Sequence, residues 1–150
     1  MKQRVLILCT GNSCRSQMAE GFLRHYGADK FDVFSAGTQP SRVNEMAIKV
    51  MREVGIDISG QVSKDVKGFL GQHFNYVITV CDKADKACPT FPGNSMRLHW
   101  FFPDPPHDQQ VTEKVLGEFR SIRDEIHVQF KRMGETGKAE RTSTGAPSED

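Results

Sequence analysis

The sequence predicts an α/β fold in which a four-stranded parallel sheet carries helices on both faces. Three observations predict it. Apolar runs of strand length alternate with amphipathic runs of helix length. The first apolar run passes through a loop rich in Gly and Asn directly into a helix. The 150 residues suffice for one buried core.

Four segments have the apolar or β-branched character of buried strands. They are residues 5–8, 31–35, 76–80 and 96–99. Because a helical segment separates each strand from the next, the strands are expected to lie parallel, with crossover helices packed on both sides of the sheet.

The predicted helices have recognisable ends. The first begins at Arg15 and stops near Gly27, and the second is capped by Asn44 and runs to about Val54. A long amphipathic helix begins at Asp108 or Thr112. Its buried stripe is Val115, Leu116, Phe119, Ile122, Ile126 and Phe130.

The domain is predicted to end at residue 133. Residues 134–150 are polar and contain no Val, Ile, Leu or aromatic side chain. Such a segment cannot bury enough apolar surface to offset the entropy of ordering it, so we expect residues 1–133 to form a single catalytic domain followed by a disordered tail.

The charge balance and the amino terminus narrow the functional class. Twenty basic and nineteen acidic side chains leave a formal charge of +1, so no broad basic surface is available for nucleic acid or anionic lipid. The apolar run at residues 5–8 is too short for a signal peptide or a membrane span. We therefore expect a cytoplasmic protein, in which four cysteines indicate thiol chemistry or metal binding rather than structural disulfides.

The loop from Cys9 to Ser16 is the strongest candidate site. Its backbone N–H groups and the following helix terminus can surround an anion, and the Arg15 guanidinium can bind two of its oxygens. The same field favours a Cys9 thiolate, and Ser16 can donate a hydrogen bond to that sulfur. The predicted oxyanion-binding residues are Thr10, Gly11, Asn12, Ser13, Cys14 and Arg15. The alternative is a buried cysteine followed by a solvent-facing arginine, and Cys14 itself is expected to serve packing.

The run from Cys9 to Gly21 resembles the phosphate-loop signature of the low-molecular-weight protein tyrosine phosphatase fold. Within that fold the chain is most similar to the thioredoxin-coupled arsenate reductases. The resemblance covers residues 3–132. It includes Ser35-Ala36-Gly37, the region of Cys81 and Cys88, His99-Trp100 and Asp104-Pro105.

Cys81 and Cys88 separate a reductase from a phosphatase. A phosphatase of this fold needs one cysteine, whereas reduction of As(V) to As(III) takes two electrons, which two thiols supply by becoming a disulfide. The resemblance implies that Cys9 attacks arsenate, Cys81 attacks Cys9, and Cys88 attacks Cys81. Thioredoxin then reduces the disulfide. Two inert thiols remain an alternative, and a zinc site would need more ligands.

A disulfide between Cys81 and Cys88 constrains the conformation of the chain between them. Seven helical residues rise about 10.5 Å, whereas a disulfide needs Cα atoms within about 7 Å. The segment 81–88 must therefore unwind or loop out if it is helical.

Asp104 is the predicted general acid. It lies in a stiff loop, residues 101–106, where the resembled family carries its acid before a proline. The alternative is an ordinary aspartate in a surface turn. Pro106 replaces an aromatic residue common in the phosphatases, and residues 38–43 offer no aromatic wall, so an aryl substrate is expected to lack a stacking surface.

Asn12, Glu20 and Ser35 are expected to support the loop. They match potassium ligands of some reductases in the resembled group, but Lys64 falls where those proteins carry an acid. Its ammonium can replace the ion and neutralise Glu20, which predicts no bound metal and no potassium dependence. A solvated surface lysine is the alternative for Lys64, and Asp65 is only one residue away.

The predicted function is a monomeric arsenate reductase with no bound cofactor and thioredoxin as a transient electron donor. It is expected to bind arsenate and phosphate and to hydrolyse phosphate esters weakly. One alternative is a phosphomonoester phosphatase that uses Cys9, Arg15 and Asp104 alone. A second is a redox sensor or oxyanion-binding module without catalysis.

Overall fold

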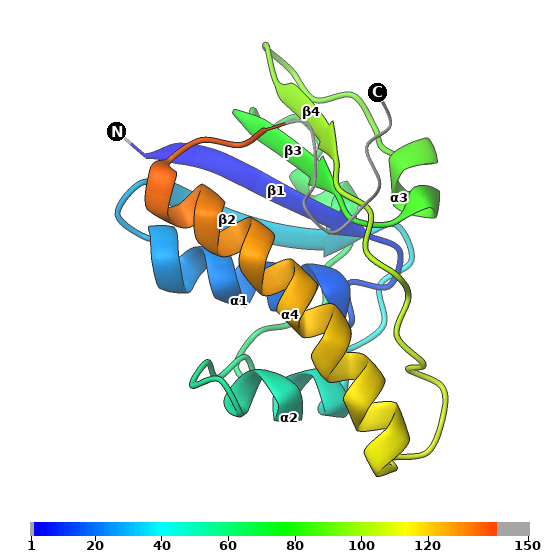
Figure 1. Cartoon of the computed structure of the whole chain (residues 1–150). Coiled ribbons are helices and arrows are strands. Elements are labelled where there is room, and N and C mark those ends of the chain that lie inside the picture. The colour runs from blue at the N-terminus through cyan, green and yellow to red at the C-terminus, as the bar shows by residue number, and fades with distance from the viewer. Residues whose placement is uncertain (1, 141–150) are drawn as a thin grey trace.

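The computed structural model describes residues 2–140 and contains the predicted parallel sheet (Figure 1). Its strands are β1 (Gln3–Cys9), β2 (Phe31–Gly37), β3 (Tyr76–Thr79) and β4 (Met96–His99). They lie in the order β2-β1-β3-β4, and every neighbouring pair is parallel. The longest apolar run therefore lies inside the sheet, as its lack of polar residues predicts.

The helices follow the predicted order, with small differences at their ends. They are α1 (Arg15–Gly27), α2 (Glu45–Arg52), the 3₁₀ turn η1 (Val66–Phe69), α3 (Asp82–Lys86) and α4 (Glu113–Thr136). The Asn44 side chain accepts from the backbone N–H groups of Met46 and Ala47, as its predicted capping role requires. Thr112, rather than Asp108, caps α4 by accepting from the Val115 N–H.

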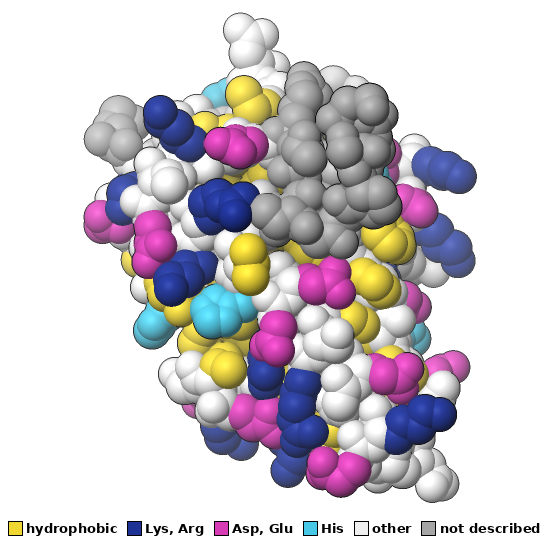
Figure 2. All heavy atoms as spheres, in the orientation of Figure 1, with side chains coloured by type: hydrophobic (Ala, Val, Ile, Leu, Met, Phe, Trp, Pro, Cys, Tyr) yellow, Lys and Arg dark blue, Asp and Glu magenta, His cyan; other side chains and the backbone are white. Residues whose placement is uncertain are grey.

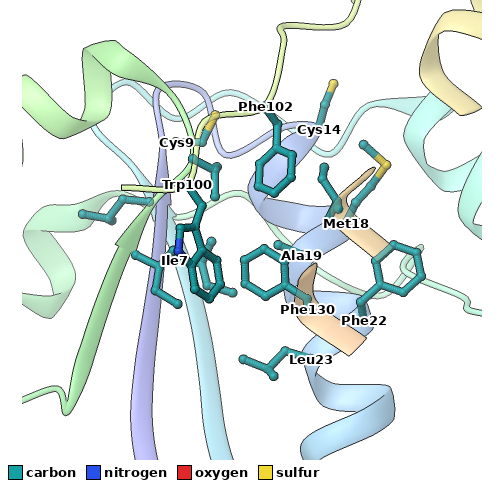
Figure 3. Close-up of a cluster of buried hydrophobic side chains, with 14 of the residues drawn as sticks. Ile7, Cys9, Cys14, Met18, Ala19, Phe22, Leu23, Trp100, Phe102 and Phe130 are labelled. Carbon is teal, nitrogen blue, oxygen red and sulfur yellow. The ribbon is translucent and has the colours of Figure 1, made fainter. Parts of the chain in front are cut away.

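Helices α1 and α4 cover one face of the sheet, and α2 packs against them (Figure 1). Figure 3 shows the resulting core, with Ile7 and Cys9 of β1 beside side chains of α1 and α4 and of the segment after β4. Its labelled apolar members are Met18, Ala19, Phe22, Leu23, Trp100, Phe102 and Phe130. Cys9 lies at the carboxyl end of β1, at the edge of this core.

The opposite face is covered by η1 and α3. Phe34 of β2 meets Phe69 of η1 edge to face, with ring centres 5.8 Å apart. Further along, Thr79 of β3 donates to Asp85 of α3 at 3.1 Å. Because Leu6 is paired with Phe34 and Leu8 with Thr79 in the sheet register, both contacts lie on the side of β1 that faces away from α1.

Ordered structure continues past the predicted domain end at residue 133. Helix α4 runs to Thr136 and is capped by Gly137 in the left-handed conformation. Gly134 is buried against α1, where an added Cβ would lie 2.7 Å from the Cβ of Tyr26. A glycine that looks like the start of a tail is thus a close helix–helix contact. The remainder of the predicted tail, residues 141–150, lies outside the described residues.

Charges of both signs alternate over the visible face, as Figure 2 shows, and neither sign gathers into a large field there. Among residues 2–140, no helix is long and apolar enough to cross a membrane.

Candidate active site

The carboxyl ends of the strands meet at one cavity of about 490 Å³. Cys9 is the last residue of β1, Cys81 comes two residues after β3, and Asp104 follows β4 by five residues. All three line the cavity together with Arg15. The fold therefore gathers four of the predicted site residues, as expected for the carboxyl edge of a parallel sheet.

The loop after β1 turns its carbonyl groups outward. The carbonyls of Cys9, Thr10, Gly11 and Ser13 accept from the backbone N–H groups of Thr38, Gln39, Ser41 and Asn44, at 2.8–3.3 Å. Gly37 permits this approach, since a Cβ there would lie 2.5 Å from the Thr10 oxygen. The N–H groups of residues 11–15 have no hydrogen-bond acceptor within the described chain. A loop with bonded carbonyls and free N–H groups is suited to an oxyanion.

Asn12 fixes the shape of this loop. Its φ of 48° is left-handed, a conformation that asparagine tolerates. The buried amide donates to Ser16 Oγ at 2.7 Å and to Ser35 Oγ at 2.9 Å, and its oxygen accepts from the Lys64 N–H. In the part of the chain that the structure describes, Ser16 makes no hydrogen bond with the Cys9 sulfur. Donation from Ser16 to that sulfur therefore stays a prediction.

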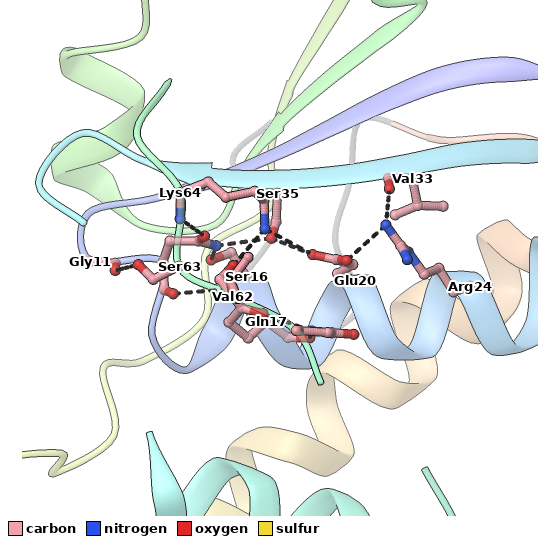
Figure 4. Close-up of polar contacts among 12 residues, drawn as sticks. Gly11, Ser16, Gln17, Glu20, Arg24, Val33, Ser35, Val62, Ser63 and Lys64 are labelled. Carbon is pink, nitrogen blue, oxygen red and sulfur yellow. Dashed lines mark hydrogen bonds and ion pairs between the residues drawn. The ribbon is translucent and has the colours of Figure 1, made fainter. Parts of the chain in front are cut away.

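Glu20 is a buried carboxylate behind the loop with two cationic neighbours. Figure 4 shows it bonded to Ser35 on one side and Arg24 on the other. The Arg24 guanidinium lies 2.9 Å from one carboxylate oxygen, and the Lys64 ammonium lies 3.9 Å from the other. Burial lowers the pKa of Lys64, although Glu20 opposes that shift. Lys64 therefore occupies the position that the sequence predicts for it, beside Glu20.

Arg15 is buried and aimed at the cavity. One terminal nitrogen donates to the Phe102 carbonyl at 3.0 Å, and the other lies 3.2 Å from an Asp104 oxygen. The second Asp104 oxygen lies 3.4 Å from His107 Nε2. The Asp104 side chain is 56% exposed, so it can exchange protons with water. An arriving anion would take its place beside Arg15.

Cys9 and Cys81 interact directly, and the contact shifts their pKa values in opposite directions. A hydrogen bond from the Cys9 thiol lowers the pKa of Cys81 to about 5, and Thr10 also bonds to the Cys81 sulfur, at 3.3 Å. The same contact, together with burial, raises the pKa of Cys9 well above its ordinary value, although Arg15 opposes that shift. The expectation that Cys9 is itself the thiolate at neutral pH stays a prediction, and the second thiol acts against it.

Burial raises the pKa values of the other two cysteines. Burial raises the pKa of Cys14 to about 12, which agrees with a packing role. Cys88 is half-buried, donates to the Pro89 carbonyl at 3.5 Å, and has a pKa that burial raises. Cys81 is the N-cap of α3 and Cys88 follows its C-cap residue, so the helix separates the two sulfurs.

The predicted site lacks five residues that line the cavity: Ser41, Asp82, Lys83, Phe101 and His107. Phe101 is 38% exposed, so the expectation of a cleft without an aromatic surface is wrong. Lys83 contributes a second cation to the lining, and His107 contacts the predicted acid. The spacing of three residues between Asp104 and His107 is the one local signal for this pair. Nothing in the sequence near Phe101 indicates its direction.

Comparisons with known proteins agree with this geometry. The family model described as low molecular weight phosphotyrosine protein phosphatase matches residues 4–142. A protein named arsenate reductase from Halalkalibacterium halodurans is 46% identical over 137 residues, covering 91% of this chain and 99% of the relative.

Solved structures give the same picture. One described as an arsenate reductase in the phosphate binding state has a TM-score of 0.72 and 36% identity, covering 91% of this chain and 98% of its own. The tyrosine phosphatase Wzb from Escherichia coli K30, solved with sulphate, has a TM-score of 0.73 and 21% identity, with 92% and 100% coverage. At that identity Wzb shares the fold alone.

Proposed function

The chain belongs to the low molecular weight phosphotyrosine protein phosphatase family, and we propose that it is an arsenate reductase that takes electrons from its own cysteines and then from thioredoxin. One observation carries the proposal: a second thiol, Cys81, interacts directly with Cys9 at the floor of an oxyanion cavity. A phosphatase has no use for that thiol, whereas two-electron reduction requires it. The relatives named arsenate reductases support the same choice.

The first step forms a bond between Cys9 and arsenic. Cys81 accepts the Cys9 proton as the Cys9 sulfur attacks arsenate. The free N–H groups of residues 11–15 and the Arg15 guanidinium stabilise the oxyanion. Asp104 protonates the departing oxygen, which leaves as water. The product is a thiol–arsenate adduct on Cys9.

The second step transfers two electrons to arsenic. The Cys81 sulfur attacks the Cys9 sulfur, the sulfur–arsenic bond breaks, and its electron pair stays on arsenic. The thiol proton goes to an oxygen of the departing arsenite. Arsenate and two thiols thus become arsenite, one disulfide and water.

The last steps return the site to its reduced state. The Cys88 thiolate attacks Cys81 and releases Cys9 as a thiolate. The dithiol of thioredoxin then reduces the Cys81–Cys88 disulfide. This cycle needs a reducing compartment, which supports a cytoplasmic location. The cysteines, the arginine and the aspartate that it uses meet within one chain, and we propose a monomer.

The test is a coupled assay with thioredoxin, thioredoxin reductase and NADPH. We expect arsenate to drive continuous NADPH consumption, and arsenite to appear in equal amount. Mass mapping of the oxidised protein should find a bridge between Cys9 and Cys81 or between Cys81 and Cys88. Absence of both bridges after arsenate treatment would refute the relay, and a redox sensor without catalysis would give no sustained NADPH consumption.

We also propose a weak phosphatase activity. Phosphate and arsenate share shape and charge, and the attack by Cys9 with protonation by Asp104 needs no second thiol. The Phe101 ring provides an apolar surface beside the loop for an aryl leaving group. Hydrolysis of p-nitrophenyl phosphate without thioredoxin is the corresponding assay.

Potassium is expected to leave the activity unchanged. Glu20 already has Arg24 and Lys64 as cationic partners, so an added cation would meet a neutralised carboxylate. Arsenate turnover should be the same in equal concentrations of potassium and sodium chloride. The Lys64→Met variant removes the ammonium but keeps the stem, and it should gain a potassium response. A wild-type rate that rises with potassium but not with sodium would contradict this role for Lys64.

A further inference from the structure

His99 lies between the sheet and helix α3, which separates the two relay cysteines. Its Nδ1 is 2.9 Å from Thr79 Oγ1, and its Nε2 is 2.9 Å from an Asp82 carboxylate oxygen. Thr79 in turn donates to Asp85 at 3.1 Å. One imidazole thus connects β3 and β4 to the first turn of α3, and indirectly to its second acidic residue.

The hydrogens of this network can be counted. The Thr79 hydroxyl has one proton, and if it donates to Asp85 it must accept from His99 Nδ1. The Asp82 carboxylate is an acceptor and requires a proton on Nε2. The Thr79 hydroxyl also lies 3.4 Å from the Leu98 carbonyl oxygen. His99, Thr79 and the two carboxylates of α3 thus form one connected network, and the anchoring of α3 depends on the His99 ring.

We propose that His99 is a positioning residue for the disulfide exchange between Cys81 and Cys88, because it ties α3 to the sheet and thereby controls when the helix unwinds. The inference rests on the proposed relay. In the exchange, the Cys88 thiolate bonds to Cys81 of the Cys9–Cys81 disulfide and Cys9 leaves as a thiolate, with no net oxidation. The five-residue helix must open for this step, since it holds the two sulfurs apart.

The capping and internal contacts of α3 stabilise the helix only weakly. Its N-cap is Cys81, which makes no side-chain capping bond. At its ends the N–H group of Asp85 donates to the Cys81 carbonyl and that of Ala87 to the Lys83 carbonyl, and five residues leave room for few further bonds. Ala84 is the buried side chain of the helix. A helix this short is not stable by itself, so its contacts with the sheet decide whether it stays folded.

The charged groups that face His99 all act on the same helix. Asp82 and Asp85 come from α3, and Arg97 comes from β4, where its guanidinium lies 3.8 Å from Asp85. Asp82 contacts the imidazole directly, and Arg97 competes with Thr79 for Asp85.

The experiment is hydrogen–deuterium exchange of the reduced protein, without arsenate, read in the peptide that covers residues 82–88. We expect His99→Gln to raise the exchange of this peptide by about fivefold relative to wild type, as loss of a charge-assisted bond on an opening segment implies.

Two further variants keep the inference open to refutation if His99→Gln folds poorly. Asp85→Asn removes the second anchor and should also speed exchange in this peptide. His73→Gln alters a histidine bonded to the Asn94 carbonyl, away from α3, and should change nothing. Unchanged exchange in both His99→Gln and Asp85→Asn would overturn the proposal.

The reaction itself provides a second readout. Starting from the Cys9–Cys81 disulfide, His99→Gln should form the Cys81–Cys88 disulfide faster than wild type, while hydrolysis of p-nitrophenyl phosphate stays the same because it needs no disulfide exchange. A merely destabilised fold would lower both rates. Failure of arsenate reduction with the exchange result intact would reject the proposed function and leave the His99 contact to α3 standing.

Discussion

Cys81→Ser is expected to lower arsenate turnover by at least about 10³-fold, since removal of an essential thiol leaves no route for electrons to arsenic. Cys88→Ser should also end steady turnover, but at a later point. The Cys88→Ser variant should release one arsenite per protein and then stop, with a disulfide between Cys9 and Cys81. Counting arsenite after a single addition of arsenate, with mass mapping of the protein, distinguishes the two blocks.

Hydrolysis of p-nitrophenyl phosphate is the matched control for these variants. It should persist in both, because Cys9, Arg15 and Asp104 remain. If Cys81→Ser and Cys88→Ser instead turn over arsenate like wild type, the chain works as a phosphatase or by another chemistry, and the relay is refuted.

The Cys81→Ser variant should also change the pH dependence of that hydrolysis. The contact with Cys81 is the largest cause that raises the pKa of Cys9. Its removal lets Arg15 dominate, so the pKa of Cys9 falls and its thiolate persists to lower pH. The acidic limb of kcat/KM for p-nitrophenyl phosphate is therefore expected to move to lower pH. If the acidic limb of the pH profile stays where it is in wild type, Cys81 does not raise the pKa of Cys9.

Asp104→Asn is expected to lower kcat for p-nitrophenyl phosphate and for arsenate by roughly 10²–10⁴-fold, the range associated with a general acid. The substitution also removes the ion pair with Arg15, so KM should stay level or fall. This split between kcat and KM separates a catalytic role from a role in binding. Measurements of both constants across a pH series check it.

Asp108→Asn is the control for Asp104→Asn. Asp108 is an exposed aspartate four residues further along the same segment, and its loss should leave both constants unchanged. An aryl phosphate with a better leaving group should recover part of the lost rate in Asp104→Asn, because it needs less protonation. Equal losses for good and poor leaving groups would show that Asp104 is not the acid.

Local patterns in the sequence were sufficient for the architecture. The apolar runs predicted all four strands, Asn44 marked the start of α2, and the start of α4 was narrowed to Asp108 or Thr112. The loop from Cys9 to Arg15 could be predicted from the sequence equally well. Its glycine, asparagine and arginine lie within a few residues of one another, so their combined geometry depends little on the rest of the chain.

Helix and domain ends were less certain from sequence. Gly134 looks like a helix stop, yet it is buried against Tyr26 and the helix continues to Thr136. A glycine can either end a helix or allow two helices to pack closely. Only the position of α1 shows that Gly134 does the second.

Local sequence is enough to show that a thiol, a guanidinium and a backbone anion loop occur together, and that two further cysteines follow. How these groups affect each other depends on the fold. The fold lowers the pKa of Cys81 and raises that of Cys9, turns Phe101 and His107 into the cavity, and sets Lys64 and His99 beside Glu20 and Asp82. These effects could not be predicted because the groups are distant along the chain. Each of these pairings except that of His107 joins segments far apart in sequence, and burial and proton sharing depend on where the fold brings those segments together.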